Sequence, residues 1–230
     1  MTADVICGDV IDVLATYADG TFTSTFSDPP YGLKFMGKRW DHGVPGVPYW
    51  AEVLRVSAPG AVLLAFGGSR THHRLYCAIE DAGLEGMTLH GRNEIYGSGF
   101  STATKCDPTI GHTPESVAAR IPRHNSHPCI KPLDLCRYFA TLIRPPEEYL
   151  DDAVLVVPFC GTGSEIIGAI LAGWRNIVGI ELDAGTCDIA RARIAWWSMA
   201  HDETGLSDPK AILKVMKKRK PLPMFAEAAS

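Results

Sequence analysis

Short apolar runs alternate with amphipathic segments along most of the 230 residues. The β-branched and aromatic residues at 21–27 and the apolar runs at 61–66 and 154–159 predict buried strands. Between these runs, apolar residues that recur every three or four positions predict helices. The predicted strands are 5–7, 21–27, 61–66, 154–159 and 177–180, and the predicted helices are 10–17, 49–56, 72–82, 132–143, 161–173 (with a turn at its start) and 184–199.

Strands and helices in alternation predict an α/β fold, with a mostly parallel sheet and helices on both faces. Two segments depart from this pattern. Residues 83–96 suggest a hairpin, and residues 97–127, rich in Gly, Ser, Thr and Pro with little periodicity, predict a small irregular insert. No apolar run approaches the roughly 18 residues that a membrane-spanning helix needs.

A glycine-containing turn follows the apolar strand at 154–159. Gly161 and Gly163 allow a tight turn and a close approach of the backbone to a ligand, and the following helix N-terminus adds positive potential. Glu181 ends the next strand, where a carboxylate can accept hydrogen bonds from a ribose diol. Ile166 replaces the third glycine of the dinucleotide fingerprint, so the pattern favours a nucleoside without pyrophosphate over a purely structural turn.

The tetrapeptide Asp28-Pro-Pro-Tyr31 stands at the carboxyl end of another predicted strand, where open α/β sheets bind ligands. Its parts suit the activation of an aromatic amine, because Asp28 and the Pro29 carbonyl can each accept one N–H. The prolines restrict the backbone, and Tyr31 offers a flat face for stacking. The alternative is a turn that simply ends the strand with a satisfied carboxylate.

Three segments in this chain order, 28–31, 127–132 (His-Pro-Cys-Ile-Lys-Pro) and 159–163, resemble the β class of S-adenosylmethionine-dependent DNA amino-methyltransferases. The resemblance extends over most of 4–200. It implies a circularly permuted Rossmann-like methyltransferase fold in which the strand before the glycine turn is the first, 177–180 the second and 5–7 the third. The chain then divides into a catalytic half (1–96), a target-recognition insert (97–127), a cofactor-binding half (128–200) and a basic C-terminal tail (201–230).

The resemblance implies S-adenosyl-L-methionine as cofactor and double-stranded DNA as partner. It assigns the target amine and base to Asp28, Pro29, Pro30 and Tyr31. It assigns the cofactor to Asp9, Asp28, Lys131, Phe159, Cys160, Gly161, Thr162, Gly163, Ser164 and Glu181, with Lys131 near the methionine carboxylate and Asp9 near the adenine. Basic residues expected near the DNA are Lys34, Lys38, Arg39, Arg120 and Arg123.

Net charge, at −4, at first argues against a nucleic-acid partner. The average hides a tail, residues 210–230, with six basic residues and one acidic residue, so that the rest of the chain carries −9 and the tail +5. The seven cysteines form no short paired spacing, which favours reduced thiols and a cytoplasmic protein of bacterial or phage-encoded type. His124, His127 and Cys129 match no zinc pattern, so no metal is expected.

We therefore expect methylation of the N6 amine of adenine in duplex DNA, by base flipping and direct displacement. Cytosine N4 methylation is the nearest alternative because it uses the same activation of an amine. Methylation of RNA or of a protein amide, and a non-catalytic nucleotide-binding regulator of DNA, are weaker alternatives. Adjacent Trp196 and Trp197 cannot both face one core, which suggests a homodimer.

Overall fold

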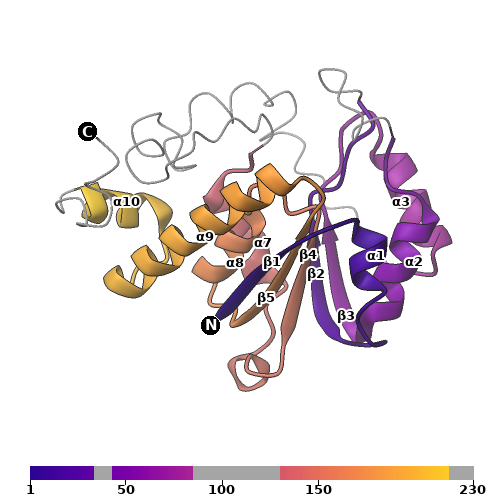
Figure 1. Ribbon diagram of the computed structural model, residues 1–230. Coiled ribbons are helices and arrows are strands. Elements are labelled where there is room, and N and C mark those ends of the chain that lie inside the picture. Colours follow the sequence, from indigo (N-terminus) through magenta and orange to yellow (C-terminus); the bar gives the residue numbers. More distant parts are fainter. Residues whose placement is uncertain (34–42, 85–129, 218–230) are drawn as a thin grey trace.

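The computed structural model describes residues 1–33, 43–84 and 130–217 (Figure 1). Some of the predicted features therefore lie outside the described residues. They are the basic loop with Lys34, Lys38 and Arg39, nearly all of the hairpin, the insert with Arg120 and Arg123, the residues His124, His127 and Cys129, and the last 13 residues of the tail.

The described residues form one parallel sheet of five strands. These are β1 (Thr2–Cys7), β2 (Phe22–Ser27), β3 (Ser57–Ala65), β4 (Val154–Pro158) and β5 (Asn176–Glu181). Their order is β1-β5-β4-β2-β3, and every neighbouring pair is parallel. β4, β5 and β1 are thus consecutive neighbours, and β2 flanks β4 on its other side, as the permuted order predicts.

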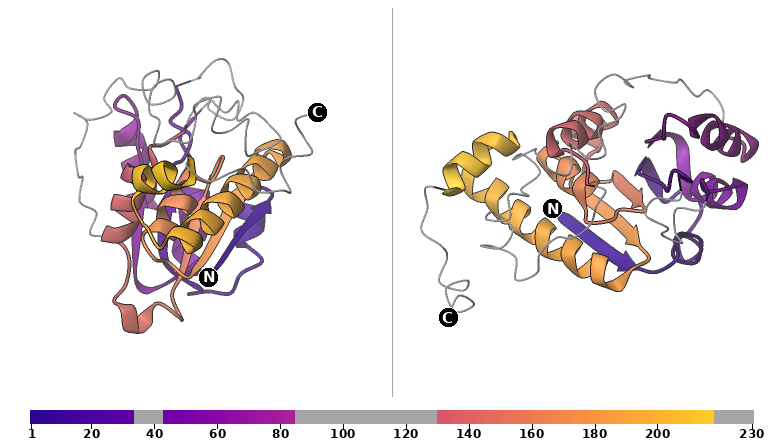
Figure 2. Two further views of the ribbon diagram at one scale, coloured as in Figure 1. Left: turned by 90° about the vertical axis from the view of Figure 1, so that its left-hand side faces the viewer. Right: turned by 90° about the horizontal axis from the view of Figure 1, so that it is seen from above.

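Helices cover both faces of the sheet (Figures 1 and 2). The helices α1 (Val10–Leu14), α2 (Val47–Val56) and α3 (His72–Asp81) pack on one face, in one cluster of buried side chains. The helices α7 (Leu133–Leu142), α8 (Ser164–Leu171) and α9 (Ala184–Thr204) pack on the other face. A 3₁₀ turn, η4 (Glu147–Tyr149), precedes β4. The helix α10 (Pro209–Lys217) lies against α9, away from the sheet.

β4 shows how the sequence pattern builds these two layers. Leu155 and Val157 point into the α7–α9 layer, whereas Val156 between them points into the α1–α3 layer, and all three are fully buried. A strand with apolar residues on both sides must lie in the centre of a sheet, which is where the chain places it. This central strand leads directly into the glycine turn.

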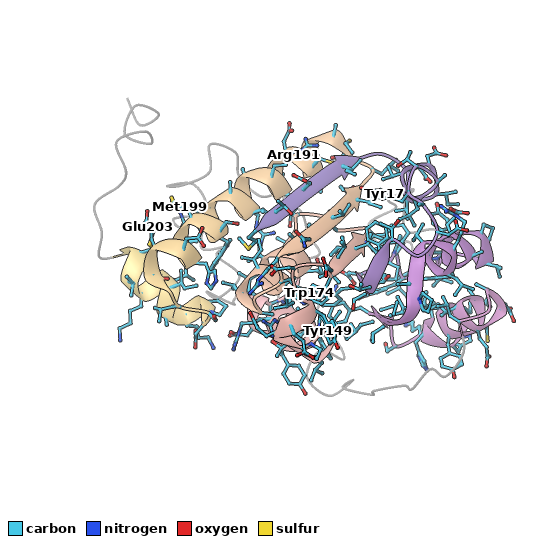
Figure 3. The ribbon with its side chains drawn as sticks, turned by 90° about the horizontal axis from the view of Figure 1, so that it is seen from below. Tyr17, Tyr149, Trp174, Arg191, Met199 and Glu203 are labelled. Carbon is cyan, nitrogen blue, oxygen red and sulfur yellow. The ribbon has the colours of Figure 1, made fainter. Side chains whose placement is uncertain are left out.

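Side chains tie the helices to the strands at fixed points (Figure 3). Arg191 of α9 donates from Nη2 to the carbonyl of Val5 in β1 at 2.8 Å. The Trp174 indole, buried between α8 and β5, donates to the carbonyl of Ala140 in α7 at 2.9 Å. These bonds hold α7 and α9 in fixed positions around the glycine turn.

The structure corrects the predicted boundaries at two places. β3 begins at Ser57 and includes Pro59, where the sequence suggested a separate turn; a proline without an N–H is tolerated because β3 ends the described sheet. The helix predicted for 184–199 continues to Thr204 and ends at Gly205, whose φ is 63°. Among the described residues, no helix is long and apolar enough to cross a membrane.

The helix α10 was not predicted from the sequence. Asp208 caps this helix, because its Oδ1 accepts the backbone N–H groups of Lys210 and Ala211 at 2.7 and 3.0 Å. Ile212, Leu213 and Met216 are buried, so the basic C-terminal segment begins as an amphipathic helix attached to the core. The dense lysines of this segment obscured its apolar face.

Candidate active site

The carboxyl ends of β2 and β4 meet at one edge of the sheet. Ser27, the last residue of β2, donates from Oγ to the carbonyl of Pro158, the last residue of β4, at 3.2 Å. Asp28 and Phe159 are the next residues along each strand. The two segments that stood out in the sequence, 28–31 and 159–164, therefore start side by side.

Both carboxylate oxygens of Asp28 have partners. The Tyr31 hydroxyl donates to Oδ1 at 2.6 Å, and the Lys131 ammonium forms a short ion pair with Oδ2. The side chains of Asp28 and Lys131 are only 15% and 18% exposed, so water screens this pair weakly. Lys131 was predicted near the methionine carboxylate of a cofactor, and the structure places its ammonium on Asp28.

Residues from the segment after β3 support Tyr31. Thr71 Oγ1 donates to the carbonyl of Tyr31 at 2.6 Å. A Cβ at Gly68 would stand 3.1 Å from the Cβ of Tyr31, so a glycine is needed for this close approach. Burial and the neighbouring Asp28 raise the pKa of Tyr31 far above its usual value, so the phenol stays neutral and acts as a donor.

Lys131 lies between charged and aromatic groups. Its Nζ is 5.3 Å from the ring centroid of Tyr31 and 5.2 Å from that of Phe66, within cation–π range. Burial alone would lower the pKa of Lys131, but Asp28, Tyr31 and Glu165 together raise the pKa well above its usual value. The ammonium is therefore permanently charged and depends on nearby carboxylates.

The glycine turn has the backbone geometry that its sequence predicts. Phe159, Gly161 and Gly163 have φ values of 58°, 50° and 80°, and Phe159 is the non-glycine residue of the described chain with a positive φ. Glu181 closes the turn from the end of β5: Oε2 accepts the N–H of Gly161 at 3.0 Å, and Oε1 accepts that of Asp183 at 2.9 Å. Burial raises the pKa of Glu181.

Three side chains of the turn face the protein interior. Thr162 and Ser164, each 3% exposed, contact Arg193, whose Nη1 donates to Thr162 Oγ1 at 2.7 Å and to Ser164 Oγ at 3.4 Å. Cys160 is 1% exposed, and burial raises the pKa of its thiol well above the usual value. Only the backbone of these three residues remains available for a ligand.

Asp9 and Phe159 lie toward α2. Asp9 caps α1, because its Oδ1 accepts the N–H of Ile11 at 2.9 Å. Tyr49 of α2 faces both groups: its ring centroid is 5.6 Å from that of Phe159, and burial together with Asp9 and Asp12 raises the pKa of its hydroxyl. Tyr49 was not predicted as a site residue, although its sequence register on α2 already placed it on the sheet side.

Glu165 and Arg193, which are 3% and 2% exposed, were also not predicted from the sequence. An acidic residue in the first turn of a helix is ordinarily solvated, and an arginine in a 21-residue helix ordinarily faces water. The available signal was register: Arg193 lies three residues after the buried Ala190. Among the described residues, no cluster of three or more His, Cys, Asp or Glu could hold a metal ion.

Comparison with known proteins gives relatives of one kind. No family model matches the chain. The chain is 24% identical over 197 residues to "Putative methylase YubD" of Escherichia coli K12, covering 77% of this chain and 83% of that protein.

Solved structures agree over a larger part of the chain. The "DNA Modification Methylase" TTHA0409 of Thermus thermophilus has a TM-score of 0.56 at 19% identity, covering 86% of this chain and 96% of that one. PvuII DNA methyltransferase, described as cytosine-N4-specific, has a TM-score of 0.53 at 13% identity, covering 84% and 86%. These neighbours confirm at the level of fold the resemblance read from the sequence. The chain therefore has the Rossmann-like methyltransferase fold.

Proposed function

We propose that the protein transfers a methyl group from S-adenosyl-L-methionine to the exocyclic N6 amine of adenine in double-stranded DNA. The observation that carries this proposal is the juxtaposition of Asp28-Pro-Pro-Tyr31 with the glycine turn, fixed by the hydrogen bond from Ser27 to Pro158. One segment suits an aromatic amine and the other suits a nucleoside cofactor. Their shared edge brings acceptor and donor within reach of each other.

The residues around the glycine turn fit S-adenosyl-L-methionine. Each oxygen of Glu181 already accepts one backbone N–H and has a second lone pair for a ribose hydroxyl. Phe159, Tyr49 and Asp9 together offer aromatic surface and a carboxylate for an adenine ring. The cofactor, when bound, supplies an electrophilic methyl group on a sulfonium. TTHA0409 has also been solved in complex with S-adenosyl-L-methionine, at a TM-score of 0.51 and 19% identity, which supports this choice.

Asp28 activates the target amine. Its carboxylate accepts one N–H and the Pro29 carbonyl accepts the other, which draws the nitrogen lone pair out of the ring and toward the methyl group. Tyr31 stacks its ring on the base while its neutral hydroxyl fixes the orientation of Asp28. Direct in-line attack needs no enzyme nucleophile, in agreement with a buried Cys160 whose pKa is raised.

The target must leave the duplex to reach this edge, at a cost of a few kcal/mol. Basic residues would offset part of that cost by contacting phosphates, which position the protein without reading sequence. The residues proposed for this role are Lys34, Lys38, Arg39, Arg120 and Arg123. A short insert at 97–127 implies a short recognition site.

One experiment identifies the product. The protein is incubated with methyl-labelled S-adenosyl-L-methionine and mixed-sequence duplex DNA, and the DNA is then digested to nucleosides. Label in N6-methyldeoxyadenosine supports the proposal. Label in N4-methyldeoxycytidine instead supports the rival activity, which the fold shared with PvuII DNA methyltransferase favours. Absence of label from DNA contradicts both.

The role of Asp28 has its own prediction. Asp28→Ala removes the acceptor of the target amine, so we expect methyl transfer to fall at least about 10³-fold, as on loss of a principal transition-state contact. Cofactor affinity, measured by calorimetry, should stay within about threefold, because Glu181 and the glycine turn are intact. Loss of cofactor binding would show that Asp28 serves the cofactor instead.

A homodimer stays a prediction. Trp197 is 3% exposed, and Trp196 packs edge-on against it at 4.9 Å between ring centroids and is itself partly buried. Sedimentation at micromolar concentration tests self-association, and a monomer there would contradict it.

A further inference from the structure

Glu165 is a buried carboxyl for which the proposed chemistry has no role. It stands in the first turn of α8 and is 3% exposed. Charged and titratable groups face it from the surrounding elements: Asp28 after β2, Lys131 and Cys136 at α7, Cys160 in the glycine turn and Arg193 in α9. A carboxylate is removed from water at such a cost that its position calls for a reason.

Helix packing places Glu165 beside the start of α7. Its Oε1 is 4.0 Å from the Sγ of Cys136, whose N–H donates to the carbonyl of Pro132, the residue after Lys131. α7 and α8 approach so closely here that a Cβ at Gly168 would stand 2.7 Å from the backbone N of Arg137. Glu165 and the Lys131–Asp28 pair therefore belong to one buried charge cluster.

Asp28 has no free oxygen for a substrate as the structure stands. Tyr31 occupies Oδ1 and Lys131 occupies Oδ2. When a target amine donates an N–H to Asp28, one of these donors must yield. Tyr31 is the less suitable one to move, because Thr71 holds its backbone and Gly68 fits against its Cβ. The Lys131 ammonium then needs another carboxylate in a region from which water is largely excluded.

Resting on the proposed function, we propose that Glu165 is a positioning residue that takes over the Lys131 ammonium when the target amine occupies Asp28 Oδ2. The exchange breaks no covalent bond and moves no proton, but it requires Glu165 to be ionised. Arg193 supports the ionised form from the opposite side, and its own pKa is lowered to about 10 by burial despite the attraction of Glu165. Glu165 thus acts on the substrate only through Lys131.

This role has a pH signature. Burial and the like charge of Asp28 raise the pKa of Glu165 to about 7, while Lys131 and Arg193 oppose the shift. Below this pH Glu165 is neutral and cannot receive the ammonium. The rate of methyl transfer should therefore rise as the pH rises through about 7, whereas cofactor binding at Glu181 should not follow the same curve.

The test compares the full-length protein with Glu165→Gln in steady-state methyl transfer to DNA between about pH 5.5 and 9. We expect the wild-type kcat to rise roughly tenfold per pH unit below the apparent pKa. Glu165→Gln should flatten this limb and lower kcat at least about tenfold above pH 8, with the KM for S-adenosyl-L-methionine within about threefold. The matched control Glu148→Gln, at an exposed position in η4, should keep the wild-type profile.

A wild-type limb and kcat in Glu165→Gln would overturn the inference, and would mean that the carboxylate of the cofactor receives Lys131. A second measurement is independent of turnover and of that variant: ¹³C-carboxyl NMR titration of Glu165 in wild type and in Lys131→Met. Loss of the ammonium should raise the pKa of Glu165, and an unchanged titration would overturn the pairing. If wild type transfers no methyl to DNA, the proposed function fails, and this titration still decides whether Glu165 senses Lys131.

Discussion

At the scale of single residues, Glu165 combines a functional role with a cost in stability. Burial raises its pKa in the folded protein from 4.5 to about 7. Between these values the folded state binds more protons than the unfolded state, so the free energy of unfolding falls as the pH rises. Glu165→Gln removes this dependence. We expect urea melts to show the variant about 2–3 kcal/mol more stable than wild type near pH 8 and nearly equal to it near pH 4.

Wild type and Glu165→Gln differing by the same amount at both pH values would contradict the buried, titrating carboxyl. A stabilised variant with impaired turnover would instead separate function from folding. Such a trade is common where an active site holds groups that the fold alone disfavours.

Glu181 offers a second residue-scale prediction. In Glu181→Gln the amide NH₂ must face either the N–H of Gly161 or that of Asp183, so one acceptor is replaced by a donor. We expect the dissociation constant for S-adenosyl-L-methionine, measured by calorimetry, to rise about 10- to 100-fold. Glu148→Gln, in η4, should leave this constant unchanged. An unaltered affinity in Glu181→Gln would remove this residue from the cofactor site.

At the scale of elements, the contact between α7 and α8 positions Lys131. A Cβ at Gly168 would stand 2.5 Å from the backbone C of Cys136, and neither backbone can yield locally. Gly168→Ala should therefore push the helices apart, with a loss of about 1–3 kcal/mol in urea unfolding and a lower kcat. Gly185→Ala is the control: its nearest neighbour is Asp183 Oδ1 at 3.4 Å, and alanine should be neutral or slightly stabilising in the first turn of α9. Equal stability of the two variants would contradict the close helix contact.

The elements themselves were largely predictable from the sequence, because runs such as 154–159 can be buried only in a central strand. Boundaries were less so: β3 continues through Pro59 because an edge strand tolerates a missing N–H. The contacts of the site were not predictable from spacing. Lys131 and Asp28 are 103 residues apart, and the ammonium reaches the carboxylate only after α7 packs on α8. Thr162 and Arg193 likewise meet across 31 residues.

At the scale of the whole molecule, the permuted order of segments was the strongest signal. Residues 28–31, 131–132 and 159–163 are distant in sequence, and a sheet ordered β1-β5-β4-β2-β3 brings all three to one edge. The same order leaves Glu181, at the end of β5, adjacent to the glycine turn. Topology alone therefore explains why these short motifs have meaning only as a set.

The division of charge between the core and the tail leads to a prediction for the whole chain. Lys218, Arg219 and Lys220 contribute to the +5 of residues 210–230, and we expect them to contact DNA phosphates. Replacing all three by Gln should weaken DNA binding and reduce the slope of log K against log salt by about 0.9 for each phosphate that the variant no longer neutralises. Arg175→Gln, at the start of β5 and therefore at the opposite edge of the sheet, is the control and should keep the slope. A slope that is unchanged in the triple variant would mean that the tail does not contact DNA. The methyl-transfer rate at saturating DNA should stay the same in every case, because the tail then adds affinity without entering the chemistry at Asp28.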